Sequence, residues 1–125
     1  MPCVLVVEDD PEIRDLVTTY LTQADFEVAT AIDGIEALRV VRSVQPAVIL
    51  MDMGLPKLNG WQTTQRLRSR SDTAHIPIIA LTAYVLEDER KRAIEIGCDA
   101  FEAKPINFES LLNKIRTLIA SPSAR

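Results

Sequence analysis

The 125-residue chain has only two cysteines and one histidine, and it lacks any long apolar run. Two isolated cysteines, Cys3 and Cys98, without a neighbouring histidine do not make a zinc site, so we expect two reduced, mostly buried thiols. No apolar stretch approaches the ~20 residues that span a bilayer, so we expect no membrane segment. Because Met1-Pro2-Cys3 leads straight into an apolar run, we expect no signal peptide and a cytoplasmic protein.

An excess of positive charge is also missing. The formal net charge is −4, whereas nucleic-acid-binding surfaces are markedly basic, so we expect no nucleic-acid partner. The chain has 47% apolar and 26% charged residues, which is ordinary for a globular protein. Without repeats or linkers, the length predicts one domain over residues 1–120 and a frayed tail at 121–125.

Short apolar runs alternate with amphipathic segments from end to end. The runs predict strands at 3–7, 26–30, 47–51, 78–81 and 99–103, the second less covered than its neighbours. The amphipathic segments predict helices at 11–23, 34–43, 61–69, 86–96 and 108–119. This alternation predicts an α/β fold, a single doubly wound five-stranded parallel sheet with helices on both faces.

Several helix ends carry recognisable signals. Asp10, Asp33 and Asn59 are acceptors at the expected N-caps, and Gly97 is an expected C-cap. The first helix is expected to bury a stripe of five side chains: Ile13, Leu16, Val17, Tyr20 and Leu21. The fourth helix is the least apolar, with expected anchors at Leu86, Ala93 and Ile94. Its low apolar content predicts a loosely held helix.

Acidic residues stand where two buried strands end. Glu8 and Asp9 follow Val4-Leu5-Val6-Val7, and Asp52 follows Val48-Ile49-Leu50-Met51. The carboxyl ends of parallel strands meet at one edge of the sheet, so three negative charges are expected in one crevice. Lys104, after the last strand, supplies one positive charge, and a divalent metal would supply the rest.

These acids allow phosphoryl chemistry. A carboxylate such as Asp52 forms an acyl phosphate when the incoming group is held in line and its charge is neutralised. Mg²⁺ suits this role because it takes one or two carboxylates and leaves room for phosphate and water. We expect Asp9 and Asp52 as direct ligands, Glu8 through a water, and the backbone carbonyl of Gly54 as a further ligand.

Two more residues complete the expected site. Thr82, at the end of the fourth strand, and Lys104 would each contact a phosphoryl oxygen. The three acids carry −3, which Lys104 and Mg²⁺ balance, so phosphorylation of Asp52 would shift the site to about −1. Nearby donors must absorb that change, and Thr82 is the movable one. The result would be a switch.

The chain resembles the receiver domains of two-component response regulators, the CheY-like family. The matching segments are Val6-Val7-Glu8-Asp9-Asp10, Leu50-Met51-Asp52 with Leu55-Pro56 and Gly60, Ala80-Leu81-Thr82-Ala83, and Ala103-Lys104-Pro105. The stretch from His75-Ile76-Pro77 to Gly97-Cys98-Asp99 further resembles stand-alone DivK-type regulators and hybrid-kinase receivers. The resemblance implies the strand order 2-1-3-4-5.

The resemblance also implies roles for individual residues. Asp52 would accept phosphate from a phosphohistidine of a histidine kinase or a histidine phosphotransfer protein. Asp9 would bind Mg²⁺ directly and Glu8 through water, with Mn²⁺ as a possible substitute, while Thr82 and Lys104 would contact the phosphate. The chain would catalyse only its own phosphotransfer and dephosphorylation.

The expected output is a protein–protein signal. Phe101 falls at the family's aromatic switch position but has no hydroxyl, and Lys104-Pro105 matches its usual cis peptide. Since we expect no effector domain after residue 120, the surface formed by the fourth helix, fifth strand and fifth helix would contact a downstream effector. The protein would be a monomer or weak dimer.

Two departures from the family pattern concern phosphate lifetime. Gly54 has no side chain to position a hydrolytic water, and Tyr84 is large enough to lean over the phosphoryl group. We therefore expect a longer-lived acyl phosphate than in relatives with polar groups at these positions.

Three alternatives compete with this interpretation. An aspartyl phosphatase usually needs a second acid two residues after the nucleophile, and Met53-Gly54 offers none. A flavodoxin-type cofactor site needs a phosphate-binding loop after the first strand, where acids stand instead. A receiver that only docks and is never phosphorylated is disfavoured by the complete set of site residues.

Overall fold

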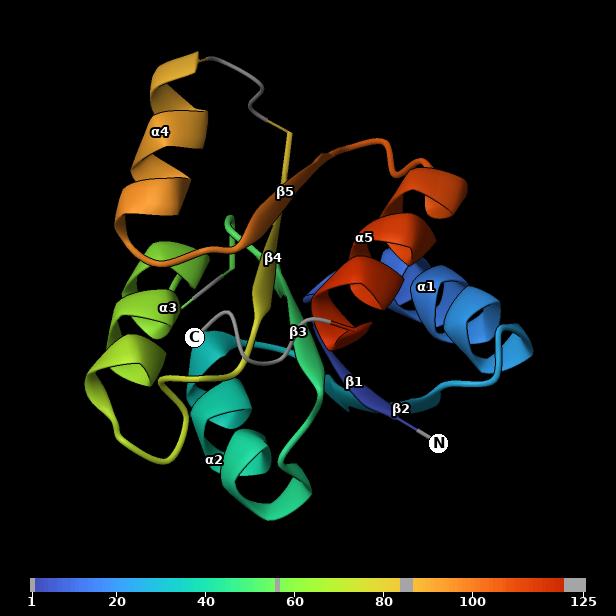
Figure 1. Cartoon of the computed structure of the whole chain (residues 1–125), viewed down its shortest axis with the longest axis horizontal. Coiled ribbons are helices and arrows are strands. Elements are labelled where there is room, and N and C mark those ends of the chain that lie inside the picture. Colours follow the sequence, from blue (N-terminus) through green and yellow to red (C-terminus); the bar gives the residue numbers. More distant parts are fainter. Residues whose placement is uncertain (1, 56, 84–86, 121–125) are drawn as a thin grey trace.

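The computed structural model describes residues 2–55, 57–83 and 87–120, which form five β-strands alternating with five α-helices (Figure 1). The strands are β1 Cys3–Val7, β2 Glu27–Ala31, β3 Val48–Asp52, β4 Ile78–Thr82 and β5 Ala100–Ala103. The helices are α1 Pro11–Gln23, α2 Gly34–Val44, α3 Gly60–Ser69, α4 Glu87–Glu95 and α5 Phe108–Ala120. Every predicted element is present, with its ends within one residue of the prediction.

The five strands form one parallel sheet in the order β2-β1-β3-β4-β5. Val7 of β1 is in register with Met51 of β3, and Thr82 of β4 is in register with Ala103 of β5. The carboxyl ends of neighbouring strands therefore lie along one edge of the sheet. The predicted doubly wound fold and its strand order are confirmed.

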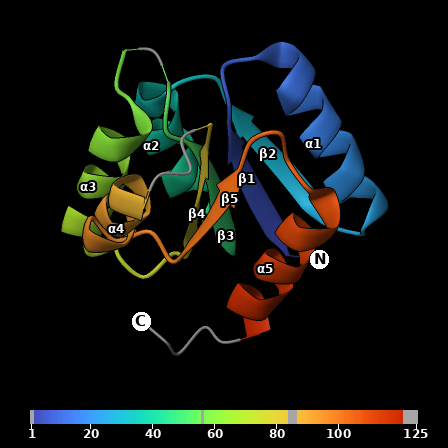
Figure 2. The ribbon, with the colours of Figure 1, turned by 90° about the horizontal axis from the view of Figure 1, so that it is seen from above.

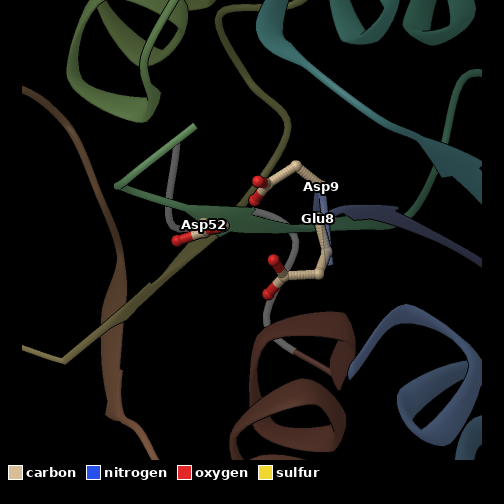
Figure 3. Close-up of side chains that lie close together, drawn as sticks. All are labelled: Glu8, Asp9 and Asp52. Atoms are coloured by element: carbon tan, nitrogen blue, oxygen red, sulfur yellow. The ribbon is translucent and has the colours of Figure 1, made fainter. Parts of the chain in front are cut away.

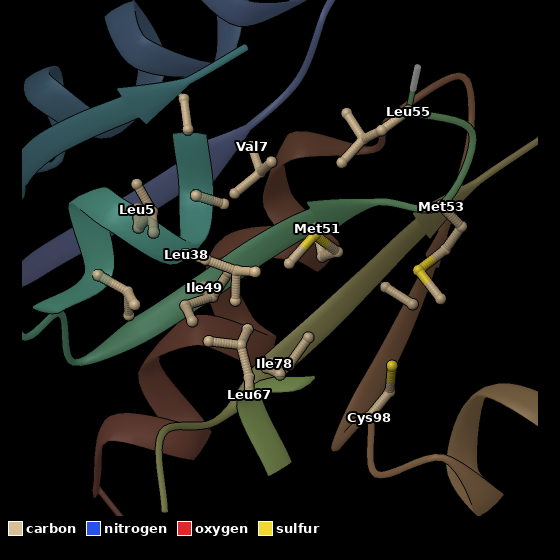
Figure 4. Close-up of a cluster of buried hydrophobic side chains, with 14 of the residues drawn as sticks. Leu5, Val7, Leu38, Ile49, Met51, Met53, Leu55, Leu67, Ile78 and Cys98 are labelled. Atoms are coloured by element: carbon tan, nitrogen blue, oxygen red, sulfur yellow. The ribbon is translucent and has the colours of Figure 1, made fainter. Parts of the chain in front are cut away.

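Helices cover both faces of the sheet (Figure 2). Helices α1 and α5 lie on one face, and α2, α3 and α4 lie on the other. Successive strand residues point to opposite faces, so Leu5 and Val7 join the cluster under α2–α4, shown in Figure 4, while Val4 and Val6 join the cluster under α1 and α5. Burial on both faces explains why the central strands are apolar throughout.

The predicted N-caps are confirmed. The Asp10 carboxylate accepts from the backbone N–H of Glu12 at 2.9 Å, and the Asp33 carboxylate accepts from that of Glu36 at 2.8 Å. At α3, Asn59 forms a reciprocal capping box with the glutamine three residues on. These bonds satisfy N–H groups that the first helical turn leaves without partners.

The end of α4 is also as predicted. Gly97 has a φ of 111°, a conformation that favours glycine. Its N–H donates to the carbonyl of Ile94 at 3.0 Å, and the N–H of Cys98 donates to that of Ala93 at 3.0 Å. This pair of bonds is a Schellman motif, which ends the helix and turns the chain toward β5.

The edge strand β2 begins one residue later than predicted. The N–H of Phe26 donates to the carbonyl of Leu21 at 3.1 Å, so Phe26 belongs to the turn that closes α1. Within the sheet, β2 pairs with β1 along one side and only Ala31 among its residues is fully covered. The prediction that β2 is less covered than its neighbours is confirmed.

Two predicted core residues prove to be exposed. Leu16 is 58% exposed because α1 packs on the sheet through a narrower stripe, in which Val17 and Leu21 are buried. Ile94 is 55% exposed because α4 turns Ala93 toward the core instead. Leu86, the third predicted anchor of α4, lies outside the described residues.

The remaining composition-based expectations can be compared directly with the structure. Cys3 is half-buried and Cys98 is buried, and no disulfide joins them. Burial, together with the charge of Glu27, raises the pKa of the Cys3 thiol above its usual range. Among the described residues, none of the helices has the length and apolar character needed to cross a bilayer.

Candidate functional site

Three carboxylates from two strand ends converge at the edge of the sheet (Figure 3). Glu8 and Asp9 directly follow β1, and Asp52 is the last residue of β3, the neighbouring strand. One oxygen from each of the three lies within 4.8 Å of the others. The predicted crevice of acids is confirmed, and its cause is the parallel register of β1 and β3.

The acids differ in burial. Glu8 is 1% exposed and Asp52 is 5% exposed, whereas Asp9 is exposed. The backbone N–H of Asp10 donates to Glu8 Oε2 at 3.2 Å, and that of Gly54 donates to Asp52 Oδ1 at 3.0 Å. Buried carboxylates are costly unless they are paired with positive charge, so this cluster favours a cation.

Lys104 provides one positive charge at the centre of the cluster. Its Nζ lies 3.0 Å from Glu8 Oε1 and 3.2 Å from Asp52 Oδ1. Its backbone N–H donates to the carbonyl of Thr82 at 2.8 Å, which ties the residue to the end of β4. The Lys104–Pro105 peptide bond is cis. A single ammonium group therefore bridges acids from two strands but leaves the cluster net negative.

The pKa values reflect both the burial of these groups and the closeness of their charges. Burial, together with the hydrogen bond and charge of Asp52, raises the pKa of Glu8 to about 7, against the opposing effects of Lys104 and the Asp10 N–H. For Lys104, burial alone would lower the pKa, but the nearby carboxylates of Glu8 and Asp52 outweigh burial and raise it. Near neutral pH, Glu8 is therefore partly protonated while Lys104 stays charged.

A cavity of about 220 Å³ opens beside Asp52. It is lined by Asp52, Met53, Gly54, Trp61, Thr82, Ala83 and Lys104. These residues come from the ends of β3 and β4, the segment after β5 and the start of α3. Since one water occupies about 30 Å³ of liquid, the cavity has room for a phosphoryl group with some water. Thr82, which is buried, thus lies on the same cavity as Asp52 and Lys104.

A comparison with known families agrees with this geometry. The family model for the response regulator receiver domain matches residues 4–116. The chain belongs to the receiver domain family. Receiver domains are the phosphoacceptor modules of two-component signalling, so the resemblance predicted from the sequence is confirmed.

Relatives of this receiver domain include proteins of two sizes. It is 37% identical over 119 residues to the DNA-binding dual master transcriptional regulator RpaA of Synechocystis sp., covering 95% of this chain and 49% of RpaA. It is 31% identical over 116 residues to the polar-differentiation response regulator DivK of Brucella anthropi, covering 93% of this chain and 94% of DivK. The chain thus spans about half of the transcriptional regulator and nearly all of DivK.

Solved structures show the same fold. The chemotaxis protein CheY4 of Vibrio cholerae is 31% identical, with a TM-score of 0.89, and the match covers 94% of this chain and 98% of CheY4. The receiver domain of a Pseudomonas aeruginosa sensor histidine kinase is 32% identical, with a TM-score of 0.89 and coverage of 96% and 98%. That kinase receiver has a magnesium ion coordinated in its active site cleft.

The donor set of this receiver domain suits a hard divalent cation. The cluster offers carboxylate oxygens from Glu8, Asp9 and Asp52, which are the ligands that Mg²⁺ and similar cations prefer. Burial and the nearby Asp52 raise the pKa of Glu8 despite the opposing charge of Lys104, so a further cation would stabilise the charged form. The three carboxylates of the cluster therefore fit a Mg²⁺ ion.

Phe101 and Tyr84 are the two remaining predicted site residues. Phe101 is half-buried on β5, three residues before Lys104, and the guanidinium carbon of Arg90 lies 5.6 Å from the centre of its ring. Its role as a switch stays a prediction. Tyr84 lies outside the described residues.

Sequence reasoning missed how closely Gly60 approaches the acceptor strand. A Cβ at Gly60 would lie 2.5 Å from the carbonyl oxygen of Asp52 and 2.6 Å from the Cα of Met53. The N-terminus of α3 can therefore pack against the end of β3 only without a side chain at this position. The loop before α3 is rich in turn formers, but that signal does not show which glycine is essential.

Two larger side chains beside the site were also missed. Arg14 of α1 donates from Nη1 to the carbonyl oxygens of Glu8 at 3.0 Å and Asp9 at 3.4 Å. Trp61, half-buried, lines the cavity, and the guanidinium carbon of Arg92 lies 4.4 Å from its ring centre. The position of Arg14 in the second turn of α1 is the one sequence signal for this contact, because helical side chains lean toward the helix N-terminus and so toward Glu8 and Asp9.

Proposed function

We propose that this receiver domain is a phosphorylation-dependent switch that accepts a phosphoryl group on Asp52. The donor is a phosphohistidine of a histidine kinase or a histidine phosphotransfer protein. The observation that carries the proposal is the cluster itself, in which Lys104 Nζ lies between Glu8 and Asp52 at 3.0 and 3.2 Å. Few structural needs explain two buried acids, a third acid and one lysine gathered in a single cluster.

Mg²⁺ is the proposed cofactor, with Mn²⁺ as a substitute. Asp9, Asp52 and the carbonyl of Gly54 would bind the ion directly, and Glu8 through a water. The ion would neutralise charge on the incoming phosphoryl oxygens. The carboxylate spacing of this chain and the magnesium ion in the similar kinase receiver both support this choice.

The proposed transfer moves one phosphoryl group between two side chains. A carboxylate oxygen of Asp52 forms a bond to phosphorus as the bond from phosphorus to the donor histidine nitrogen breaks. That nitrogen keeps the electron pair, and because the other ring nitrogen carries a proton, the histidine leaves in its neutral form. Lys104 and Thr82, which line the same cavity as Asp52, would hold the phosphoryl oxygens in place.

The proposed output is a change in the surface formed by α4, β5 and α5. Phosphorylation adds about one negative charge at Asp52, which Thr82 would meet by moving its hydroxyl, and Phe101 would respond on β5. A downstream protein effector would bind this surface. The chain would perform no chemistry beyond its own phosphotransfer and dephosphorylation.

The partner for phosphotransfer is a protein, and a groove beside the site supports this. A largely apolar groove of about 200 Å³ shares Lys104 with the acidic cavity. Leu16, 58% exposed, lines it together with Ile13 and Phe108. Exposed apolar residues next to a reactive group suit the binding of another protein surface.

We expect a cytoplasmic monomer or weak dimer, with a domain that ends near residue 120.

A long phosphate lifetime is part of the proposal. Among the described residues, a Cβ at Gly54 would come within 4 Å of Asp52 Oδ1 alone, at 3.7 Å, so a larger side chain has room beside the acceptor. Gly54→Asn would place an amide there to hold an attacking water, and we expect faster loss of phosphate. Tyr84→Ala should do the same by removing a bulky group. Decay of the phosphorylated protein, followed by intact-mass spectrometry, checks both; unchanged decay in the two variants would contradict this part.

Labelling by acetyl phosphate tests the function. Wild type should become phosphorylated with Mg²⁺ and lose labelling when a chelator removes it, and Asp52→Asn should not label. Asp10→Asn is the matched control, because Asp10 is the N-cap of α1 and asparagine caps equally well. Labelling of Asp52→Asn at the wild-type level, or no labelling of wild type, would refute the proposal.

A further inference from the structure

Arg14, in the second turn of α1, reaches back over the end of β1. Its Nη1 donates to the carbonyl oxygen of Glu8 at 3.0 Å and to that of Asp9 at 3.4 Å. Helical side chains lean toward the helix N-terminus, which explains why a residue of α1 covers the segment before the helix. One guanidinium group thus holds two consecutive peptide groups that carry two of the three acids of the site.

The orientation of these two peptide groups decides where the acids point. Glu8 and Asp9 are adjacent, and both side chains approach Asp52 from the end of β1 (Figure 3). Glu8 is also held by its N–H bond to the carbonyl of Ala31 at 3.0 Å, whereas Asp9 is exposed at the rim. A rotation of the peptide between Glu8 and Asp9 would therefore change the spacing of the carboxylates.

We propose that Arg14 is a positioning residue for the cation site and that it favours Mg²⁺ over larger cations; this inference rests on the proposed function. Mg²⁺ needs near-octahedral geometry at about 2.0–2.1 Å, whereas Ca²⁺ accepts six to eight oxygens at about 2.3–2.6 Å in flexible arrangements. Loosening the Glu8–Asp9 segment should therefore weaken Mg²⁺ binding much more than Ca²⁺ binding.

A purely electrostatic role for Arg14 predicts the opposite result. Its positive charge lies near the acids, so removing that charge would strengthen the binding of any divalent cation. Mg²⁺ and Ca²⁺ carry the same charge, so both would gain by a similar factor. The sign of the change and the ratio between the two cations therefore separate positioning from charge.

The experiment measures the Kd of Mg²⁺ and of Ca²⁺ for the full chain by titration calorimetry. The fluorescence of Trp61, the single tryptophan, gives a second readout because this residue lines the cavity. Arg14→Gln removes the charge and the guanidinium fork and leaves only a shorter amide donor, while Arg14→Lys keeps the charge without the planar fork. Arg39→Gln on α2 is the control, since its side chain is 76% exposed.

We expect Arg14→Gln to raise the Kd of Mg²⁺ by about 10-fold, as for other residues that orient metal ligands, and that of Ca²⁺ by less than about 3-fold. The same loss of selectivity in Arg14→Lys would assign the effect to hydrogen-bond geometry. Tighter binding of both cations, or a lower Tm with unchanged Kd values, would overturn the inference.

The inference and the proposed function can fail separately. If wild type binds neither cation and Asp52 takes no label, the proposed function fails. If wild type binds Mg²⁺ and is labelled, but the Arg14 variants keep the selectivity of Arg39→Gln, only the role of Arg14 is refuted.

Discussion

At the scale of single residues, this receiver domain depends on close contacts around Asp52. Lys104 bridges its carboxylate to Glu8, the N–H of Gly54 holds the same carboxylate oxygen, and Gly60 allows α3 to approach its backbone. The three residues come from different parts of the chain, namely the segment after β5, the loop after β3 and the start of α3, so a small change in any one of them alters the geometry of the acceptor. Gly54 and Gly60 differ in the space that a side chain would have, so substitutions at the two positions can be compared.

Gly60→Ala should destabilise the protein by about 1–3 kcal/mol, the usual cost of forcing extra atoms into a packed site. The added Cβ would meet the Asp52 carbonyl oxygen at 2.5 Å, so the strand end or the helix must shift. Gly54→Ala is the matched control, because among the described residues its Cβ would make only an ordinary contact, at 3.7 Å. Urea unfolding of both variants checks this; equal stabilities would contradict it.

At the scale of elements, α4 is the helix least anchored by apolar side chains. Ala93 is its one buried residue, and Ile94 is exposed. Two arginines add further anchoring of α4. Arg92 lies over the Trp61 ring at 4.4 Å, and Arg90 lies over the Phe101 ring at 5.6 Å. Such cation–π contacts contribute about 0.5–1 kcal/mol each at exposed sites.

Arg92→Gln should therefore speed amide hydrogen exchange in α4 by about 2–5-fold, the equivalent of one such contact. The effect of Arg90→Gln should be smaller, because Arg90 lies farther from the Phe101 ring than Arg92 lies from the Trp61 ring. Lys91→Gln, between the two on the exposed surface, is the control and should leave exchange unchanged. Exchange in α2 of the same samples separates a local effect from global unfolding. Equal rates in all three variants would disprove the anchoring role.

At the scale of the whole molecule, the burial of Glu8 and its closeness to Asp52 link stability to pH. The pKa of Glu8 is about 7 in the folded protein and about 4.5 when exposed, so between these values the folded state binds more protons than the unfolded state. The stabilising contribution is complete below pH ~4.5 and is lost as pH rises toward 7. The cost at neutral pH comes first from burying the charged carboxylate of Glu8 and then from holding it beside Asp52.

Without divalent cations, the free energy of unfolding should contain a component that falls between pH 4.5 and 7 and is absent in Glu8→Gln. Glu109→Gln, in the first turn of α5, is the control and should keep that component. Saturating Mg²⁺ should reverse its sign, because the metal binds the deprotonated form. Chemical unfolding at several pH values measures this component of the free energy of unfolding. Parallel curves for wild type and Glu8→Gln would rule the linkage out.

Much of the fold and site could be predicted from local patterns. The caps at Asp10, Asp33 and Asn59 are decided within a few residues, as is the Schellman end at Gly97, and all four are as expected. Burial of individual helix residues was harder to predict. Leu16 and Ile94 fit an apolar period, but their exposure depends on how each helix rotates against the sheet.

By itself, the sequence determined the order of the elements, the direction of the strands and the placing of acids at two strand ends, because periodicity and caps act between near neighbours in the chain. Only the tertiary structure decided that Lys104 bridges Glu8 and Asp52, that Gly60 touches the acceptor strand, and that Arg14 holds the two neighbouring carbonyls. These contacts join residues from different elements. Their distances follow from how closely helices pack on the sheet, which no local pattern specifies.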